Sequence, residues 1–205
     1  MIKLYRHELS GHSHRVELFL NLLNLDFERI DVDLMAGEHK GEDFLRLNPF
    51  GQVPVLVDGD VVIGDSNAIL VYLAEAYDAG GDWYPRVPTV RADIQRWLSA
   101  AAGSIAAGPG AARLVTVFGA SIDHERAKTI ANDLLTTVDG VLAERGFLAG
   151  ASPTIADLAG YAYIAHAPEG EVSLAPYPNV RAWLARIEAL DGFVGMVRSP
   201  VGLAA

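Results

Sequence analysis

The first 77 residues alternate short β-prone runs with segments of helical periodicity. Residues 2–5 and 27–32 are β-prone, and between them apolar side chains recur at helical spacing, at Val16, Phe19, Leu20 and Leu23. A second apolar stripe on that helix indicates that it is covered on two sides. Strand, helix and strand in this order favour two parallel strands joined by a right-handed crossover.

The pattern continues with a hairpin and a further helix. A polar segment over residues 37–44 fits a helix or a loop, and residues 53–57 and 61–63 flank the turn sequence Asp58-Gly59-Asp60. Asp65-Ser66 then opens the next helix. The predicted order of elements is therefore βαβαββα.

Glycine and proline mark the end of this region. Gly80, Gly81, Pro85 and Pro88 indicate a linker, and no run beyond it is typical of a strand. We therefore expect an α/β domain at residues 1–78, a linker at 79–88 and an all-helical domain at 89–205.

Four segments of the second domain show helical spacing: residues 90–112, 123–145, 154–166 and 178–190. In the first, a kink or break is expected from Gly103, Gly108, Pro109 and Gly110. Thr154 and Asp157 form a capping box, to which we assign a structural role.

The net charge and the absence of cysteine limit the ligands and reactions to be expected of this protein. The 205 residues carry a formal net charge of −10 and no cysteine. Nucleic-acid-binding proteins usually present a basic surface, so no nucleic-acid partner is expected. Without cysteine there is no thiolate ligand for zinc and no thiol nucleophile, so any reactive sulfur has to arrive with a ligand.

No targeting or membrane segment is visible. The N-terminus is charged, and no stretch approaches the ~18 uninterrupted apolar residues of a membrane helix. We expect a soluble, cytoplasmic protein without a membrane partner.

Four motifs follow one another along the chain. They are Ser10-Gly11-His12-Ser13-His14-Arg15-Val16, Asn48-Pro49-Phe50-Gly51-Gln52-Val53-Pro54-Val55-Leu56, Gly64-Asp65-Ser66-Asn67-Ala68-Ile69-Leu70-Val71-Tyr72-Leu73, and Phe147-Leu148-Ala149-Gly150 with Pro153-Thr154-Ile155-Ala156-Asp157. Together they resemble the cytosolic glutathione transferase family. The resemblance implies a thioredoxin-like N-terminal domain, an all-helical C-terminal domain, and glutathione as co-substrate with no metal.

The resemblance assigns Gln52, Val53 and Pro54 to glutathione. It implies a cis peptide bond before Pro54, so that the Val53 backbone pairs with the cysteinyl backbone of glutathione as a short added strand. Gln52 is implied to bind the γ-glutamyl end.

Asp65 and Ser66 stand at a helix start, where they serve as caps with or without a ligand. The resemblance implies that the γ-glutamyl carboxylate lies at this positive helix end and accepts from Ser66, while Asp65 accepts from the α-amino group. His39 and Lys40 are either residues of a solvated loop or, as the resemblance implies, the partners of the glycyl carboxylate.

Ser10 is the candidate catalytic residue, although a serine before a helix is also a common cap. A hydrogen bond to a charged acceptor contributes roughly 1.5–3 kcal/mol, which lowers a thiol pKa by about one to two units. The positive end of the helix acts in the same direction. Ser13 is the rival for this role, and His12 is a candidate further donor.

A serine in this position resembles the serine-type classes, theta- and zeta-like, including bacterial members. Zeta-like members carry a second serine where this chain has Gly11, which leaves isomerase activity open. The second-substrate site is expected between the domains. Its candidate residues are Leu9, Ser104, Ala107, Gly108 and Arg113.

The expected activity is that of a glutathione S-transferase in detoxification: the glutathione thiolate attacks a small apolar electrophile. A homodimer is expected, as is usual in the family. A glutathione-dependent isomerase or peroxidase and a non-catalytic glutathione-binding protein remain alternatives.

Overall fold

The computed structural model describes residues 1–203, and these fall into two compact units. The first contains Met1–Gly81 and Asp191–Val197, and the second contains Asp82–Leu190 and the chain from Arg198 onward. The segment Asp191–Val197 thus returns to the first unit, which the domain limits expected from the sequence do not include. One contact of this return is the bond between His14 Nε2 and the carbonyl of Val194, at 2.8 Å.

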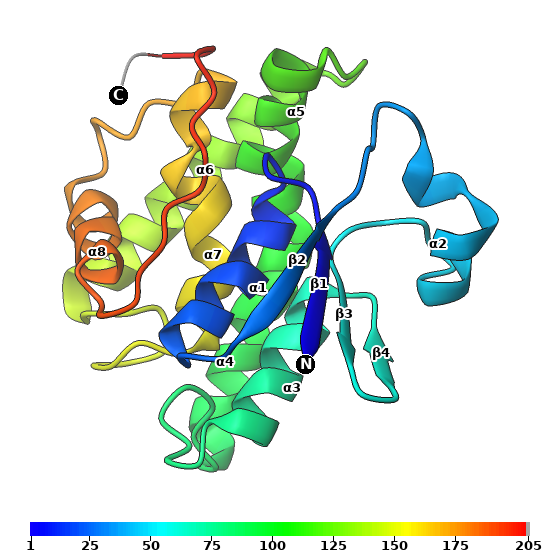
Figure 1. Ribbon diagram of the computed structural model, residues 1–205. Helices are drawn as coiled ribbons and strands as arrows, with labels where there is room; N and C mark the ends of the chain where they lie inside the picture. Colours follow the sequence, from blue (N-terminus) through cyan, green and yellow to red (C-terminus); the bar gives the residue numbers. More distant parts are fainter. Residues whose placement is uncertain (204–205) are drawn as a thin grey trace. The chain divides into compact units, whose positions relative to one another are not determined.

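The first unit is built on a four-stranded sheet in the order β2-β1-β3-β4 (Figure 1). The strands are β1 (Ile2–Arg6), β2 (Phe27–Asp31), β3 (Val55–Asp58) and β4 (Val61–Ile63). The helices are α1 (Gly11–Leu22), the 3-10 turn η1 (Glu38–Lys40), α2 (Glu42–Leu47) and α3 (Ser66–Tyr77). β1 pairs with β2 in parallel and with β3 in antiparallel fashion, so the predicted βαβαββα fold is confirmed.

Strand directions decide where the helices begin. α1 leaves the C-terminal end of β1, and β3 runs antiparallel to β1 with Val55 opposite Tyr5. β4 turns back again and places Ile63 opposite Leu56, so α3 also begins near this end of β1. The first residues of α1, β3 and α3 therefore meet at one edge of the sheet.

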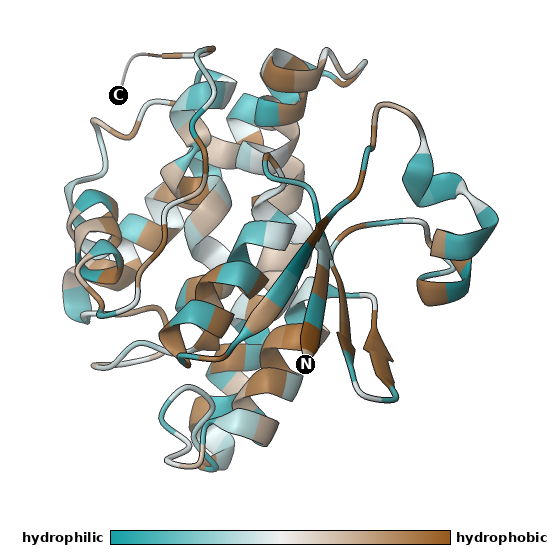
Figure 2. Cartoon of the chain, in the orientation of Figure 1, coloured by the Kyte–Doolittle hydropathy of each residue, from teal (hydrophilic) through white to brown (hydrophobic). Residues whose placement is uncertain are grey.

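Successive side chains of each strand point to opposite faces of the sheet, and an apolar layer forms on each face. Leu4 is buried on one face of the sheet, whereas Tyr5 packs on the other with Phe44 of α2 and with Val55. Figure 2 shows β3 and β4 as predominantly apolar strands, and β4 leaves Val61 exposed at the edge of the sheet. The helices α1 and α3 contact each other, and α2 lies on the opposite side of the sheet (Figure 1).

In the described residues of the second unit, the regular elements are all helices, and one isolated β-bridge joins Phe147 and Gly150. Its helices are α4 (Pro88–Ala100), η2 (Ala101–Gly110), α5 (Ala111–Phe118), α6 (His124–Glu144), α7 (Ile155–Ala165), η3 (Ala167–Gly170) and α8 (Pro178–Glu188). Almost every residue of α7 is buried, so this helix forms the centre of the unit, in contact with α4, η2 and α8.

Of the kink or break expected near Gly108 and Pro109, the break does not occur in the described chain. The segment η2 is instead a π-helix, and the residues at its junctions with α4 and α5 keep right-handed helical angles. Gly108 allows η2 to approach α6 closely, because a Cβ there would lie 2.9 Å from the backbone nitrogen of Ala131. The glycine and proline residues thus widen the helix without ending it.

The predicted capping box of α7 is confirmed. Its Asp157 side chain also binds groups outside the helix terminus. The fully buried Asp157 carboxylate accepts hydrogen bonds from the backbone N–H groups of Thr154 and Leu148, both at 2.8 Å, and from Trp183 Nε1 at 2.9 Å. One side chain therefore fastens the start of α7 to the preceding loop and to α8.

Replacing Asp157 tests this arrangement. Asp157→Ala leaves three buried N–H donors without an acceptor, as well as the Thr154 hydroxyl, and at about 1–3 kcal/mol for each N–H the variant should lose at least ~3 kcal/mol of unfolding free energy. Asp123→Ala, which removes the exposed cap of α6, should cost only ~1 kcal/mol. Urea denaturation measures both losses, and equal costs would contradict the central role of Asp157.

Candidate functional site

The start of α1 presents a serine hydroxyl at the sheet edge. Ser10 is the N-cap, and its Oγ accepts from the Ser13 N–H at 3.2 Å. Within residues 1–203 the Ser10 hydroxyl has no acceptor for its own proton. Ser13 is only 1% exposed, and its Oγ accepts from the His7 N–H at 3.3 Å. The geometry therefore favours Ser10 over Ser13 as a donor to a ligand.

The start of α3 contributes an acid, a buried hydroxyl and the backbone N–H groups of a first helical turn. Asp65 is exposed and caps the helix through a 2.8 Å bond from the Ala68 N–H to its Oδ1. Ser66 is 4% exposed, and its Oγ accepts from the Arg15 guanidinium at 3.2 Å. Arg15 is fully buried and also donates to Asn67 Oδ1 at 2.8 Å. A cation therefore lies beneath the first turn of α3, where a ligand carboxylate is expected.

His12 joins the two helix starts. Its Nδ1 lies 3.4 Å from Ser66 Oγ. Burial, together with the nearby charge of Arg15, lowers the pKa of His12 to about 3. His12 is therefore neutral at physiological pH and offers one N–H donor without a charge.

The start of β3 exposes backbone groups of the kind that strand addition requires. The Val53–Pro54 bond is cis, which confirms the expectation from the motif. In the described part of the chain, the N–H and C=O of Val53 have no hydrogen-bond partner. Gln52 is exposed beside it. An extended peptide backbone can pair with Val53 here.

His39 and Lys40 lie in η1, close to the same loop. Lys40 Nζ donates to the carbonyls of Phe50 and Gly51, at 3.2 and 2.8 Å. Gly51 allows this approach, because a Cβ there would lie 2.7 Å from the carbonyl oxygen of His39. Lys40 thus fastens η1 to the loop before Gln52 and remains exposed, and His39 is half-buried beside it.

The candidate second-substrate residues do not share one environment. Leu9, in the first unit, is half-buried in the turn before α1. In the second unit, Ser104 lines a cavity of about 410 Å³ with Trp97 and Ile130, whereas Ala107 is exposed and Gly108 is buried against α6. Ser104, Ala107 and Gly108 therefore do not form one lining within this unit.

The structure corrects the expectation that Arg113 belongs to the second-substrate site. Its side chain is 1% exposed and donates through Nε to Glu169 at 2.5 Å. Such a buried pair belongs to the interior of the helical unit and does not supply an exposed donor to a second substrate.

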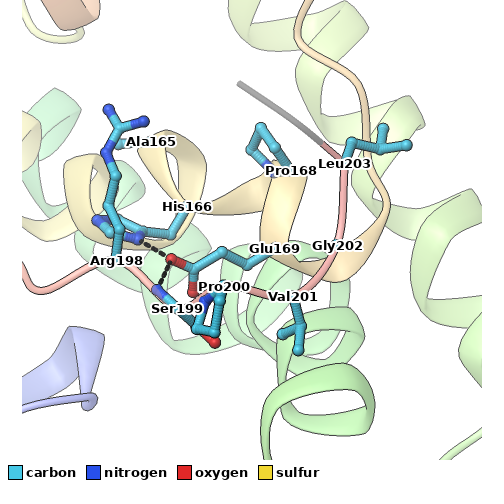
Figure 3. A pocket seen from close by; sticks show the side chains of 10 residues that line it. All are labelled: Ala165, His166, Pro168, Glu169, Arg198, Ser199, Pro200, Val201, Gly202 and Leu203. Carbon is cyan, nitrogen blue, oxygen red and sulfur yellow. Dashed lines mark hydrogen bonds and ion pairs between the residues drawn. The ribbon is translucent and has the colours of Figure 1, made fainter.

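Glu169 is the centre of a polar cluster that the sequence did not indicate. His166 Nδ1 and the backbone nitrogen of Ser199 each bond to its carboxylate at 2.8 Å, beside a cavity of about 350 Å³. Figure 3 shows both bonds as dashed lines. Burial lowers the pKa of His166. It also raises the pKa of Glu169, but the donors around this carboxylate outweigh burial and bring its pKa below the ordinary value. The cluster fastens the segment after Arg198 to η3.

Comparison with known proteins agrees with this geometry. Residues 9–76 match the pattern described as "Glutathione S-transferase, N-terminal domain", and residues 114–191 match "Glutathione S-transferase, C-terminal domain". The chain is 36% identical to glutathione S-transferase 3 of Zea mays, over 94% of its own length and 91% of the relative's. The chain belongs to the glutathione S-transferase family. It is also 32% identical to human glutathione S-transferase theta-2, over 93% and 82% of the two lengths, in line with its theta-like motifs.

Two solved glutathione S-transferase structures are similar along nearly the whole chain. That of a Pseudomonas fluorescens glutathione S-transferase has a TM-score of 0.90 at 30% identity, covering 96% of this chain and 98% of that one. That of a glutathione transferase homologue from Drosophila mojavensis, with bound glutathione, has a TM-score of 0.85 at 28% identity, covering 93% and 88%.

Two absences within residues 1–203 concern metal ions and membranes. Nowhere in this range do His, Cys, Asp or Glu side chains gather in a group of three that would hold a metal ion. No helix in the same range combines the length and the apolar character that crossing a membrane requires.

The lowered pKa of His12 predicts a pH dependence of stability. The unfolded chain protonates His12 near pH 6.5, but the folded protein does so only near pH 3. Between these values the unfolded state binds more protons, so this residue makes stability fall as the pH falls. His12→Gln should therefore lose less unfolding free energy than the wild type between about pH 6.5 and about pH 4.

Urea denaturation at a series of pH values measures the two slopes. An NMR titration of the His12 ring gives its midpoint directly. Equal slopes together with a midpoint near the ordinary value of 6.5 would show that His12 is not held neutral.

Proposed function

We propose that the protein is a glutathione transferase that binds glutathione in its first unit, ionises the thiol and transfers sulfur to small apolar electrophiles. The observation that supports this most directly is the meeting of three segment starts at one sheet edge, each with polar groups open to a ligand. Membership of the family and the glutathione-bound relative point to the same ligand.

Each part of glutathione has a suitable partner on this edge. The Val53 N–H and C=O pair with the cysteinyl backbone as an added strand. The γ-glutamyl carboxylate lies at the start of α3, where Ser66 donates and the buried Arg15 adds positive potential. Asp65 accepts from the α-amino group through its second carboxylate oxygen, and Gln52, exposed in the separate loop before β3, binds the same γ-glutamyl end.

His39 and Lys40 are the proposed partners of the glycyl carboxylate. Lys40 already holds two loop carbonyls, and the third ammonium hydrogen remains for the ligand. The protein is acidic overall, so these local positive groups have to supply the attraction for a ligand with two carboxylates.

The proposed reaction uses a thiolate stabilised mainly by neutral groups. The Ser10 hydroxyl donates to the sulfur at the positive end of α1, and the thiol proton leaves to solvent. The thiolate then forms a carbon–sulfur bond with the electrophile, and the leaving group departs with the electron pair of the bond that breaks. Because the chain has no cysteine, this sulfur has to be that of glutathione.

The same proposal extends to the second-substrate site and to the assembly. Leu9 and Ala107 are the candidates with accessible side chains, and Ser104 faces its own cavity. We also propose that the protein is a homodimer, because an isologous two-fold interface is the commonest assembly.

Ser10→Ala tests the thiolate hypothesis. Loss of one hydrogen bond to a charged acceptor should raise the pKa of the bound glutathione thiol by about one to two units. Ultraviolet titration of the thiolate band in the complex measures this shift. Ser13→Ala is the matched control and should leave the thiol pKa unchanged, so the opposite pattern would assign the role to Ser13.

Ser66→Ala tests the γ-glutamyl site. The variant should bind glutathione more weakly by about 1.5–3 kcal/mol, the usual contribution of a hydrogen bond to a charged group. Calorimetry gives the affinity, with Ser99→Ala on the exposed side of α4 as a control that should bind normally. Equal affinities for wild type and Ser66→Ala would remove this hydroxyl from the site.

A further inference from the structure

One buried amide links the two loops that hold the proposed ligand groups. Asn48 ends α2 and is 2% exposed. Its Nδ2 donates to the carbonyl of Gln52 at 2.8 Å and to the carbonyl of Gly64 at 3.1 Å. Its Oδ1 accepts from the Phe50 N–H at 3.1 Å. Both amide hydrogens and the amide oxygen are thus engaged with backbone groups.

The two carbonyls belong to separate parts of the proposed site. Gln52 immediately precedes Val53, and Gly64 immediately precedes Asp65 and Ser66. Neither loop is part of the sheet ladder at these residues, so its backbone polar groups need other partners. Asn48 provides them, and it fixes the distance between the strand-addition edge and the start of α3.

The absence of a side chain at Gly64 leaves room for the Asn48 amide. A Cβ at residue 64 would lie 2.7 Å from Cγ of Asn48, and the two other nearest atoms also belong to the Asn48 amide. Gly64 does not adopt a left-handed conformation, so its backbone would accept alanine. The close approach to Asn48 is therefore the reason for glycine here.

We propose that Asn48 is a positioning residue for glutathione, which holds the loop of Gln52 and Val53 in register with the start of α3. This inference rests on the proposed function, because it concerns the same ligand. Asn48 does not touch the sulfur in this arrangement; it acts through the backbone carbonyls that it binds. It should therefore govern affinity for glutathione and leave the acidity of the bound thiol unchanged.

A double-mutant cycle tests the contact between Asn48 and Gly64 by changing each residue in turn. Asn48→Ala removes both donations, and Gly64→Ala pushes the intact amide out of place. Each variant should weaken glutathione binding about tenfold or more, as expected for the loss of hydrogen bonds at one site. In the double variant the methyl group added at position 64 occupies space that the amide has left. Its affinity should therefore equal that of Asn48→Ala alone and not show the product of the two losses.

Calorimetry with glutathione gives the affinities, and ultraviolet titration at saturating glutathione gives the thiol pKa, which should match the wild type in all three variants. Asn21→Ala, which removes a local side-chain bond to the Glu17 carbonyl on α1, is the control and should bind normally. If the wild type binds glutathione and both single variants bind as tightly, the role of Asn48 is overturned and the proposed function stands. A wild type without affinity for glutathione would overturn the proposed function itself.

Discussion

The directions of the strands around β1 determine which polar groups come together where a ligand can bind. β3 runs against β1, and β4 turns back again, so the first residues of α1, β3 and α3 reach the same edge of the sheet. Polar groups at the start of a helix or strand have no partner within their own element. The topology therefore gathers unpaired donors from residues far apart in the sequence, and a peptide-like ligand can satisfy them together.

Electrostatics at this edge relies on few charges, and the main one is buried. Arg15 has no exposure to solvent, and it lies under Ser66 and Asn67, where its field acts at the first turn of α3. The same charge helps to keep His12 neutral. A protein with a formal charge of −10 can thus attract an anionic ligand at one place without a basic surface.

Local patterns explain how much of the fold was predictable. Alternation and helical spacing identify the strands and helices of the first unit, and the turn sequence at Asp58-Gly59-Asp60 identifies the hairpin, because each signal lies within a few neighbouring residues. The motifs likewise identify the cap at Ser10 and the cis bond before Pro54. The roles of Arg15 and Asn48 depend on partners in other segments of the chain. Ser66, for example, is 51 residues from Arg15, and the periodicity of the sequence does not reveal such contacts.

The second unit shows where local reasoning fails. The sequence offers Ser104, Ala107 and Gly108 as candidates for one lining, but they lie in a π-helical segment with i→i+5 bonding, in which successive side chains are spaced around the axis differently from those of an α-helix. Arg113 resembles an accessible donor in the sequence, yet Glu169, 56 residues later, pairs with it in the interior. Changes of helical phase and buried ion pairs are visible only once the chain is folded.

If the first unit binds glutathione and ionises its thiol, the release of protons on binding measures both events at once. Calorimetry near pH 7 in two buffers of different ionisation enthalpy gives the number of protons released. Glutathione should bind with release of a substantial fraction of a proton, and S-methylglutathione should bind with none. Binding of both ligands with no difference in proton release, or no binding of either, would contradict the proposed function.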